Sequence, residues 1–93
     1  MKYSIIIEPN AKEDLKSIYS FIKGNGSLYI AKDFLFQLKN QINSLSHMPQ
    51  RCRKSLYHSD DKTKDLIYKG YTISYFIQKD TVHVVAVFRQ RNY

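Results

Sequence analysis

Residues 66–93 read LIYKGYTISYFIQKDTVHVVAVFRQRNY, and this stretch predicts three consecutive antiparallel strands. Lys69-Gly70 separates two runs rich in aromatic and β-branched residues, and a two-residue link that ends in Gly favours a type I′ turn. Residues 78–80, Gln-Lys-Asp, predict the next reversal. The run from Thr81 to Phe88 is apolar on both faces, which favours a central position in the sheet over an edge position.

Simple alternation along this last strand predicts which of its side chains share a face. Val85 and Val87 are expected on one face, and the other face is expected to carry Val82, Val84 and Ala86.

Candidate functional residues follow directly after the same strand. Arg89, Arg91 and Tyr93 bring two guanidinium groups and a phenol to one rim of the predicted sheet. Such a group suits a surface that meets phosphate or carboxylate, because guanidinium groups donate paired hydrogen bonds to both. A solvated, frayed chain end is the alternative interpretation.

The first half of the chain predicts a strand and a helical hairpin. Tyr3 to Ile7 is a short β-branched strand, and Asn10 with Glu13 forms a candidate capping pair for the first helix. That helix carries its apolar stripe at Leu15, Ile18, Tyr19 and Ile22. Residues 24–26, Gly-Asn-Gly, are expected to end it, with Gly in the left-handed conformation.

Ser27 is the expected cap of the second helix. Pro49 is expected to stop this helix, whose apolar stripe is Ala31, Phe34, Leu38, Ile42 and Leu45. The two stripes need one face of the sheet as a partner, which predicts an α+β two-layer domain ordered β-α-α-β-β-β. The sheet would be mainly antiparallel and four-stranded. Part of residues 49–65 could pair with the sheet as a strand extension.

Composition places limits on the class of protein. A length of 93 residues allows a single domain, 1–93, with one core. The net charge is +7, and residues 49–93 hold nine Lys or Arg against four Asp. Small basic domains bind nucleic acid or acidic proteins. With one cysteine, Cys52, and no membrane-length apolar run, we expect a cytoplasmic protein without an internal disulfide.

The order of these features resembles the RelE/ParE superfamily of bacterial toxins along nearly the whole chain. The resemblance is carried by the first strand, the stretch PNAKEDLKSIYSFI, and the proline after Leu45. In the second half it is carried by YKGY, the aromatic-rich strand, the short acidic turn, the valine-rich strand and the basic tail. It implies the toxin of a type II toxin–antitoxin pair, with an acidic antitoxin as partner.

The resemblance leaves two targets open. ParE-like members poison DNA gyrase by binding it, and the spaced apolar residues of the helical hairpin look more like ParE. RelE-like members cut mRNA on the ribosome with basic residues and a tyrosine. In that case Arg89 or Arg91 would hold the phosphate and Tyr93 would transfer the proton, without metal or cofactor. Many ParE-like chains carry His-x-Arg-Arg where this chain has Arg89-Gln90-Arg91-Asn92.

A second basic group provides further candidates for binding. Arg51, Arg53 and Lys54 would position phosphates or dock an acidic partner, and an ordinary charged loop is the alternative. Lys69, at the tip of the first turn, is another candidate or a plain solvated lysine. We find no metal-ligand spacing among the histidines. A basic RNA- or protein-binding module without toxicity is the third functional hypothesis.

Overall fold

The computed structural model describes residues 2–47, 49, 53–54 and 62–89, and it contains two helices and five strands within them. In chain order these are β1 (Ser4–Ile7), α1 (Pro9–Asn25), α2 (Leu28–Asn43), β2 (Arg53–Lys54), β3 (Lys64–Tyr68), β4 (Tyr71–Gln78) and β5 (Thr81–Arg89). A short 3-10 turn, Ser44–Ser46, follows α2.

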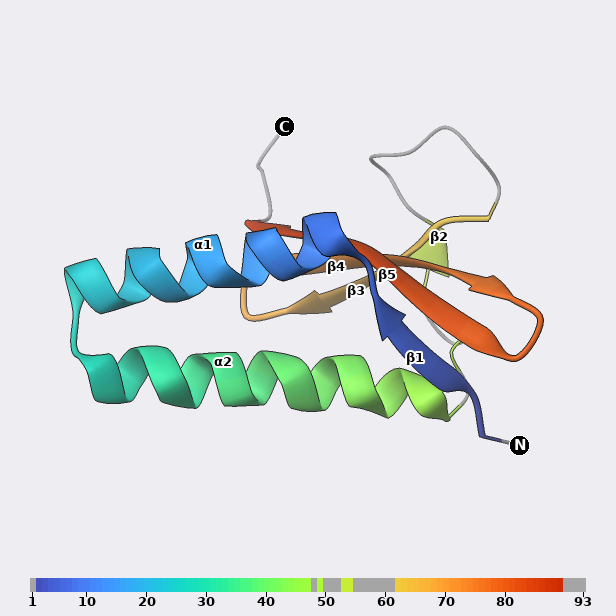
Figure 1. The fold of residues 1–93 in the computed structure, drawn as a ribbon, viewed down its shortest axis with the longest axis horizontal. Coiled ribbons are helices and arrows are strands. Elements are labelled where there is room, and N and C mark those ends of the chain that lie inside the picture. The colour runs from blue at the N-terminus through green and yellow to red at the C-terminus, as the bar shows by residue number, and fades with distance from the viewer. Residues whose placement is uncertain (1, 48, 50–52, 55–61, 90–93) are drawn as a thin grey trace.

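The strands form one sheet in the order β1-β5-β4-β3-β2, and the two helices lie together over it (Figure 1). β1 is parallel to β5, and every other neighbouring pair is antiparallel. The predicted α+β order is therefore confirmed, and β5 lies inside the sheet as expected. Two residues of the 49–65 segment, Arg53 and Lys54, extend the sheet as a fifth strand, β2.

Both predicted hairpin turns are present. Lys69 and Gly70 have φ angles of +47° and +83°, the two positive values that a type I′ turn requires. Lys79, with φ +55°, reverses the chain between β4 and β5. The two turns therefore set the register in which β3 meets β4, and β4 meets β5, next to each turn.

The predicted division of faces on β5 is wrong after Val84. Tyr75 pairs with Val84 while its neighbour Ser74 pairs with Ala86, so Val85 is an extra residue in a β-bulge. The extra residue reverses the alternation. Val87, rather than Ala86, joins Val82 and Val84 in the core under the helices.

Two details of the helix ends also differ from expectation. The first helix begins at Pro9, with Glu8 as its N-cap, so Asn10 lies inside the helix and does not cap it. Proline is well suited to a first helical position because it has no N–H to satisfy and its φ is already helical. Gly26 follows the helix with φ −154°, an extended rather than a left-handed conformation.

The second helix begins as expected, because the Ser27 side chain accepts a hydrogen bond from the Ile30 N–H at 3.1 Å. Its α-helical part ends at Asn43, before Pro49, and the 3-10 turn carries the buried Leu45. The core lies between the hairpin and the sheet, and it consists of Ala11, Leu15, Ile18, Leu38, Ile42, Leu45, Ile73, Tyr75, Val82, Val84 and Val87.

Candidate functional site

The predicted cationic rim begins at the end of β5. Arg89 is exposed, pairs across the sheet with Tyr71, and lines a hollow of about 340 Å³ with Phe21, Ile18 and Ser17 of α1. A guanidinium beside two aromatic rings can hold an anionic or planar group. Arg91 and Tyr93, the other two members of the predicted group, lie outside the described residues.

The second basic group lies on a different part of the sheet. Arg53 and Lys54 form β2 and pair with Asp65 and Lys64, whereas Arg51 lies outside the described residues. β2 is three strands away from β5. With about 4.8 Å between neighbouring strands, roughly 14 Å separates the backbones of the two basic segments across the sheet. The backbone alone therefore does not bring Arg53 next to Arg89.

Lys69 has intramolecular contacts at the tip of the β3–β4 turn. Its Nζ donates a hydrogen bond to Gln37 Oε1 at 3.0 Å and lies 5.5 Å from the centroid of the Tyr68 ring. The Tyr68 hydroxyl donates to the same Gln37 oxygen at 2.6 Å. These contacts hold the turn against α2. A partner that binds the Lys69 ammonium group therefore has to break its hydrogen bond to Gln37.

Three of the strand aromatics, Tyr68, Tyr75 and Phe76, make packing contacts within the fold. Phe34 of α2 stacks on Tyr68, with 6.4 Å between ring centroids. Tyr75 is fully buried, and its hydroxyl donates to the carbonyl of Pro49.

The Phe76 ring lies parallel to the His83 ring, with 4.8 Å between ring centroids, and His83 Nδ1 lies 2.8 Å from Glu8 Oε1. His83 thus joins the start of α1 to β5.

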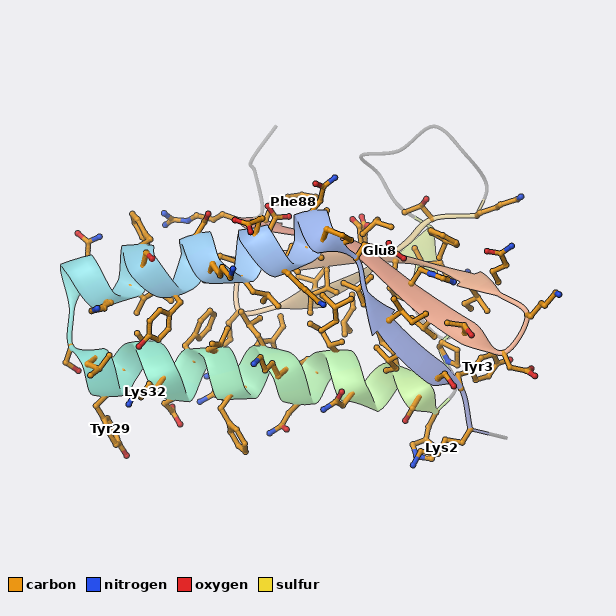
Figure 2. The ribbon with its side chains drawn as sticks, viewed as in Figure 1. Lys2, Tyr3, Glu8, Tyr29, Lys32 and Phe88 are labelled. Atoms are coloured by element: carbon orange, nitrogen blue, oxygen red, sulfur yellow. The ribbon has the colours of Figure 1, made fainter. Side chains whose placement is uncertain are left out.

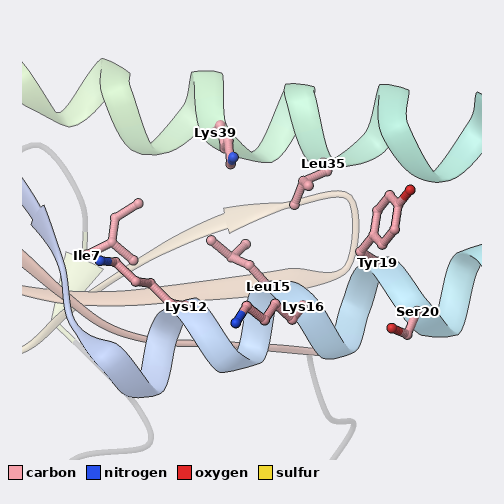
Figure 3. A pocket seen from close by; sticks show the side chains of 8 residues that line it. All are labelled: Ile7, Lys12, Leu15, Lys16, Tyr19, Ser20, Leu35 and Lys39. Carbon is pink, nitrogen blue, oxygen red and sulfur yellow. The ribbon is translucent and has the colours of Figure 1, made fainter.

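The structure also contains a groove that the sequence did not predict. It lies between α1 and α2 and has a volume of about 550 Å³. Figure 3 shows Leu15 and Leu35 side by side between the helices, with the sheet behind them. Ile7 and Tyr19 extend the apolar lining, and the polar lining residues are Lys12, Lys16, Ser20 and Lys39.

This groove combines an apolar floor with a positive rim. Lys12, Lys16 and Lys39 line it, and the lining contains no acidic residue. An amphipathic segment with apolar side chains on one face and carboxylates on the other would match both features. In the sequence, this positive rim is indicated only by the four-residue spacing of Lys12 and Lys16, which places the two side chains on one face of a helix.

Two other classes of site receive no support from the described residues. Within them there is no group of three or more His, Cys, Asp or Glu side chains that could hold a metal ion. No helix of the described chain is long and apolar enough to cross a membrane.

The first strand, the helical hairpin on one face of the sheet and the antiparallel strands that end at Arg89 form the architecture expected from the resemblance to the RelE/ParE superfamily. Residues 5–93 match the family model of the ParE toxin of the type II toxin–antitoxin system parDE. The chain therefore belongs to the ParE toxin family, and it is the toxin of a type II toxin–antitoxin system. None of the curated proteins compared with the chain matches it.

Solved structures agree on the fold. The chain is similar to a structure of the chromosomal ParDE toxin–antitoxin system of P. aeruginosa, with a TM-score of 0.86 and 14% identity over 97% of this chain and 98% of that one. It is also similar to a structure of the RelBE2 toxin–antitoxin complex of Mycobacterium tuberculosis. That match has a TM-score of 0.63 and 23% identity over 97% of this chain and 100% of the other.

Proposed function

We propose that the protein arrests growth by binding and inhibiting DNA gyrase, and that an acidic antitoxin neutralises it by binding the groove between α1 and α2. The observation that carries the choice of target is the family match, which is to ParE over residues 5–93. The resemblance to ParE implies a gyrase poison that performs no chemistry of its own.

The placement of the cations also favours a binding inhibitor. Metal-independent RNA cleavage needs an acid, a base and cations gathered around one phosphate. Among the described candidates, Arg89 lies at the end of β5, Lys69 is hydrogen-bonded to Gln37, and Arg53 is on the far strand β2. The backbone positions of these three residues are spread over the sheet, which suits an extended contact with a macromolecule.

The antitoxin assignment rests on the chemistry of the groove. Its apolar lining is open to solvent, and its three lysines give it a positive rim, which Glu13 offsets in part because its carboxylate is 3.6 Å from Lys16 Nζ. A partner with alternating acidic and apolar residues would bury the apolar surface and neutralise the lysines together. Opposite charges would also accelerate its association, and added salt would slow it.

RNA cleavage is the second candidate function, and the hollow at Arg89 favours it. There a cation adjoins the rings of Phe21 and Tyr71, an arrangement on which a nucleobase could stack beside its phosphate. Under this alternative, Arg91 and Tyr93 would complete the site. A basic module without toxicity would leave bacterial growth unchanged when it is expressed.

A pair of assays with the purified toxin separates these functions. Gyrase supercoiling is followed on relaxed plasmid, and mRNA integrity is followed in a translating extract at the same toxin concentrations. The proposal expects loss of supercoiling with intact mRNA. Cleaved mRNA with undisturbed supercoiling would transfer the assignment to the second candidate. Arg89→Ala is then informative, since it would abolish cleavage but only weaken an extended binding contact.

A further inference from the structure

The end of the helical hairpin carries an exposed apolar cluster. Leu28, Tyr29 and Ile30, which we call the hairpin tip, form the first turn of α2 and have exposed fractions of 46%, 81% and 56%. Figure 1 shows that this end of the hairpin extends beyond the strands. Figure 2 shows Tyr29 directed away from both helices.

The exposure of three consecutive residues is itself informative. Successive side chains on an α-helix are about 100° apart, so three in a row span more than half of the helix circumference. Some helical faces are exposed in any surface helix, but here all three consecutive side chains are exposed, Tyr29 most of all. Large apolar side chains gathered at one exposed place mark interaction sites far more often than scattered ones do.

The tip is also held in a fixed conformation. Ser27 caps α2 by accepting from the Ile30 N–H, and the Asn25 side chain donates to the Phe21 carbonyl at the end of α1. These two hydrogen bonds fix the backbone that carries the tip residues, so binding requires little ordering of the backbone there. Exposed aromatic residues on a fixed backbone are frequent anchors of protein interfaces.

Charge distinguishes between the possible occupants. Lys23 and Lys32 are near the tip in the sequence and Asp33 follows Lys32, so the tip region carries a net charge of +1 within a chain of net charge +7. A second copy of this +7 chain would bring like charges together, whereas a protein surface with an apolar cleft and nearby carboxylates would match both features. The tip is also separate from the groove, since none of its three residues lines that groove.

We infer that the hairpin tip is the element that inserts into the inhibited target protein, while the groove between the helices binds the antitoxin. This inference rests on the proposed function, since it assigns the surface by which the toxin holds gyrase. Tyr29 is the central anchor, Ile30 and Leu28 flank it, and Lys32 contacts acidic groups around the cleft.

The test compares Tyr29→Ala/Ile30→Ala with Phe36→Ala. Phe36 is a suitable control because it is 63% exposed on the same helix but lies two turns from the tip. The expected result is at least a tenfold rise in the toxin concentration that halves supercoiling, and lost growth arrest, for the tip variant alone. The affinity of the tip variant for the antitoxin should change by less than twofold.

A charge reversal near the tip provides a second test. Lys32→Glu should also weaken gyrase inhibition, whereas Lys79→Glu, at the exposed β4–β5 turn, should not.

Circular dichroism establishes that each variant is folded, and the outcomes then divide clearly. A folded tip variant that arrests growth like the wild type would overturn the inference. The inference is also overturned if the tip substitutions abolish antitoxin binding, because the tip would then bind the antitoxin. It is likewise overturned if they abolish dimerisation of the wild type, measured by light scattering, or its pelleting with acidic phospholipid vesicles. These results would assign the tip to a second copy of the chain or to a membrane surface. If the wild-type toxin does not inhibit gyrase, the proposed function alone is overturned. The effect of the tip substitutions on growth arrest then still tests whether the tip binds the target.

Discussion

The carboxylate of Asp14 in α1 accepts a hydrogen bond from the backbone N–H of Val87 in β5, at 2.9 Å. β1 pairs with β5 only as far as Val84, and beyond it no strand of the described residues pairs with the outer edge of β5. Asp14 supplies an acceptor there that a strand would otherwise provide. The helix thus completes the edge of the sheet, next to the bulge at Val85, and fixes the strand that ends at Arg89.

Loss of this acceptor should destabilise the fold. Asp14→Ala leaves a half-buried N–H without its partner, and we expect the free energy of unfolding to fall by about 1–3 kcal/mol. Asp14→Asn keeps an acceptor oxygen and should lose less. Urea unfolding followed by circular dichroism measures both, with the exposed neighbour Glu13→Ala as the control. Equal stability of the Asp14→Ala and Glu13→Ala variants would contradict this role.

Removal of a buried hydroxyl in β4, that of Thr72, should have the opposite effect and stabilise the fold. Thr72 Oγ1 is fully buried and has no hydrogen-bond partner within the described structure. Thr72→Val keeps the shape and removes the unsatisfied group, so we expect a gain of about 1 kcal/mol in the free energy of unfolding.

Ser74, two residues along the strand, is the matched comparison. Its hydroxyl donates to Asp65 Oδ1 at 2.9 Å, and both residues are buried. Ser74→Ala should therefore cost about 1–2 kcal/mol, the reverse of the effect at Thr72. Thermal unfolding of the two variants gives the comparison, and a loss of stability in Thr72→Val would show that its hydroxyl has a partner.

The β3–β4 turn depends on backbone conformation at Gly70. Its φ of +83° is strained for any residue with a Cβ, although a methyl group there would meet no atom within 4 Å. Gly70→Ala should cost about 1–2 kcal/mol through the backbone alone. Gly24→Ala, in α1 and equally free of steric contact, should instead stabilise by about 0.5–1 kcal/mol. Melting temperatures that shift in the same direction would contradict this reasoning.

The lysines around the groove should govern antitoxin affinity. Lys12→Glu/Lys16→Glu reverses two charges that line the groove and should weaken binding of an acidic antitoxin at least tenfold at low salt. Affinity of the wild type should fall as salt rises, because exposed charges are screened beyond about 10 Å at 0.1 M. The double variant should show a smaller salt dependence in calorimetric titrations. Unchanged affinity would remove the antitoxin from this groove.

Local chemistry explains which features could be read from the sequence. Lys69-Gly70 specifies its turn by its own conformational preferences, and Ser27 caps the helix that follows it. The start of α1 was misplaced because Pro9 competes with the Asn10–Glu13 signal and is itself favoured at a first helical position. The faces of β5 could not be predicted past Val84, since the bulge arises from pairing with another strand.

The site was harder to predict because it depends on tertiary placement. The apolar stripes correctly indicate which side of each helix meets the sheet. They do not indicate that Lys39 of α2 borders the same groove as Lys12 and Lys16 of α1. In the same way, Lys69 appears as an exposed turn lysine until the fold brings Gln37 within 3.0 Å of it.

The most direct measurement is gyrase supercoiling of relaxed plasmid with purified toxin, alone and with an equimolar amount of its antitoxin. If the protein acts by binding gyrase, the toxin alone stops supercoiling in a dose-dependent manner, and the antitoxin restores it. Full supercoiling in the presence of a large excess of folded toxin that still arrests growth in cells would contradict this account.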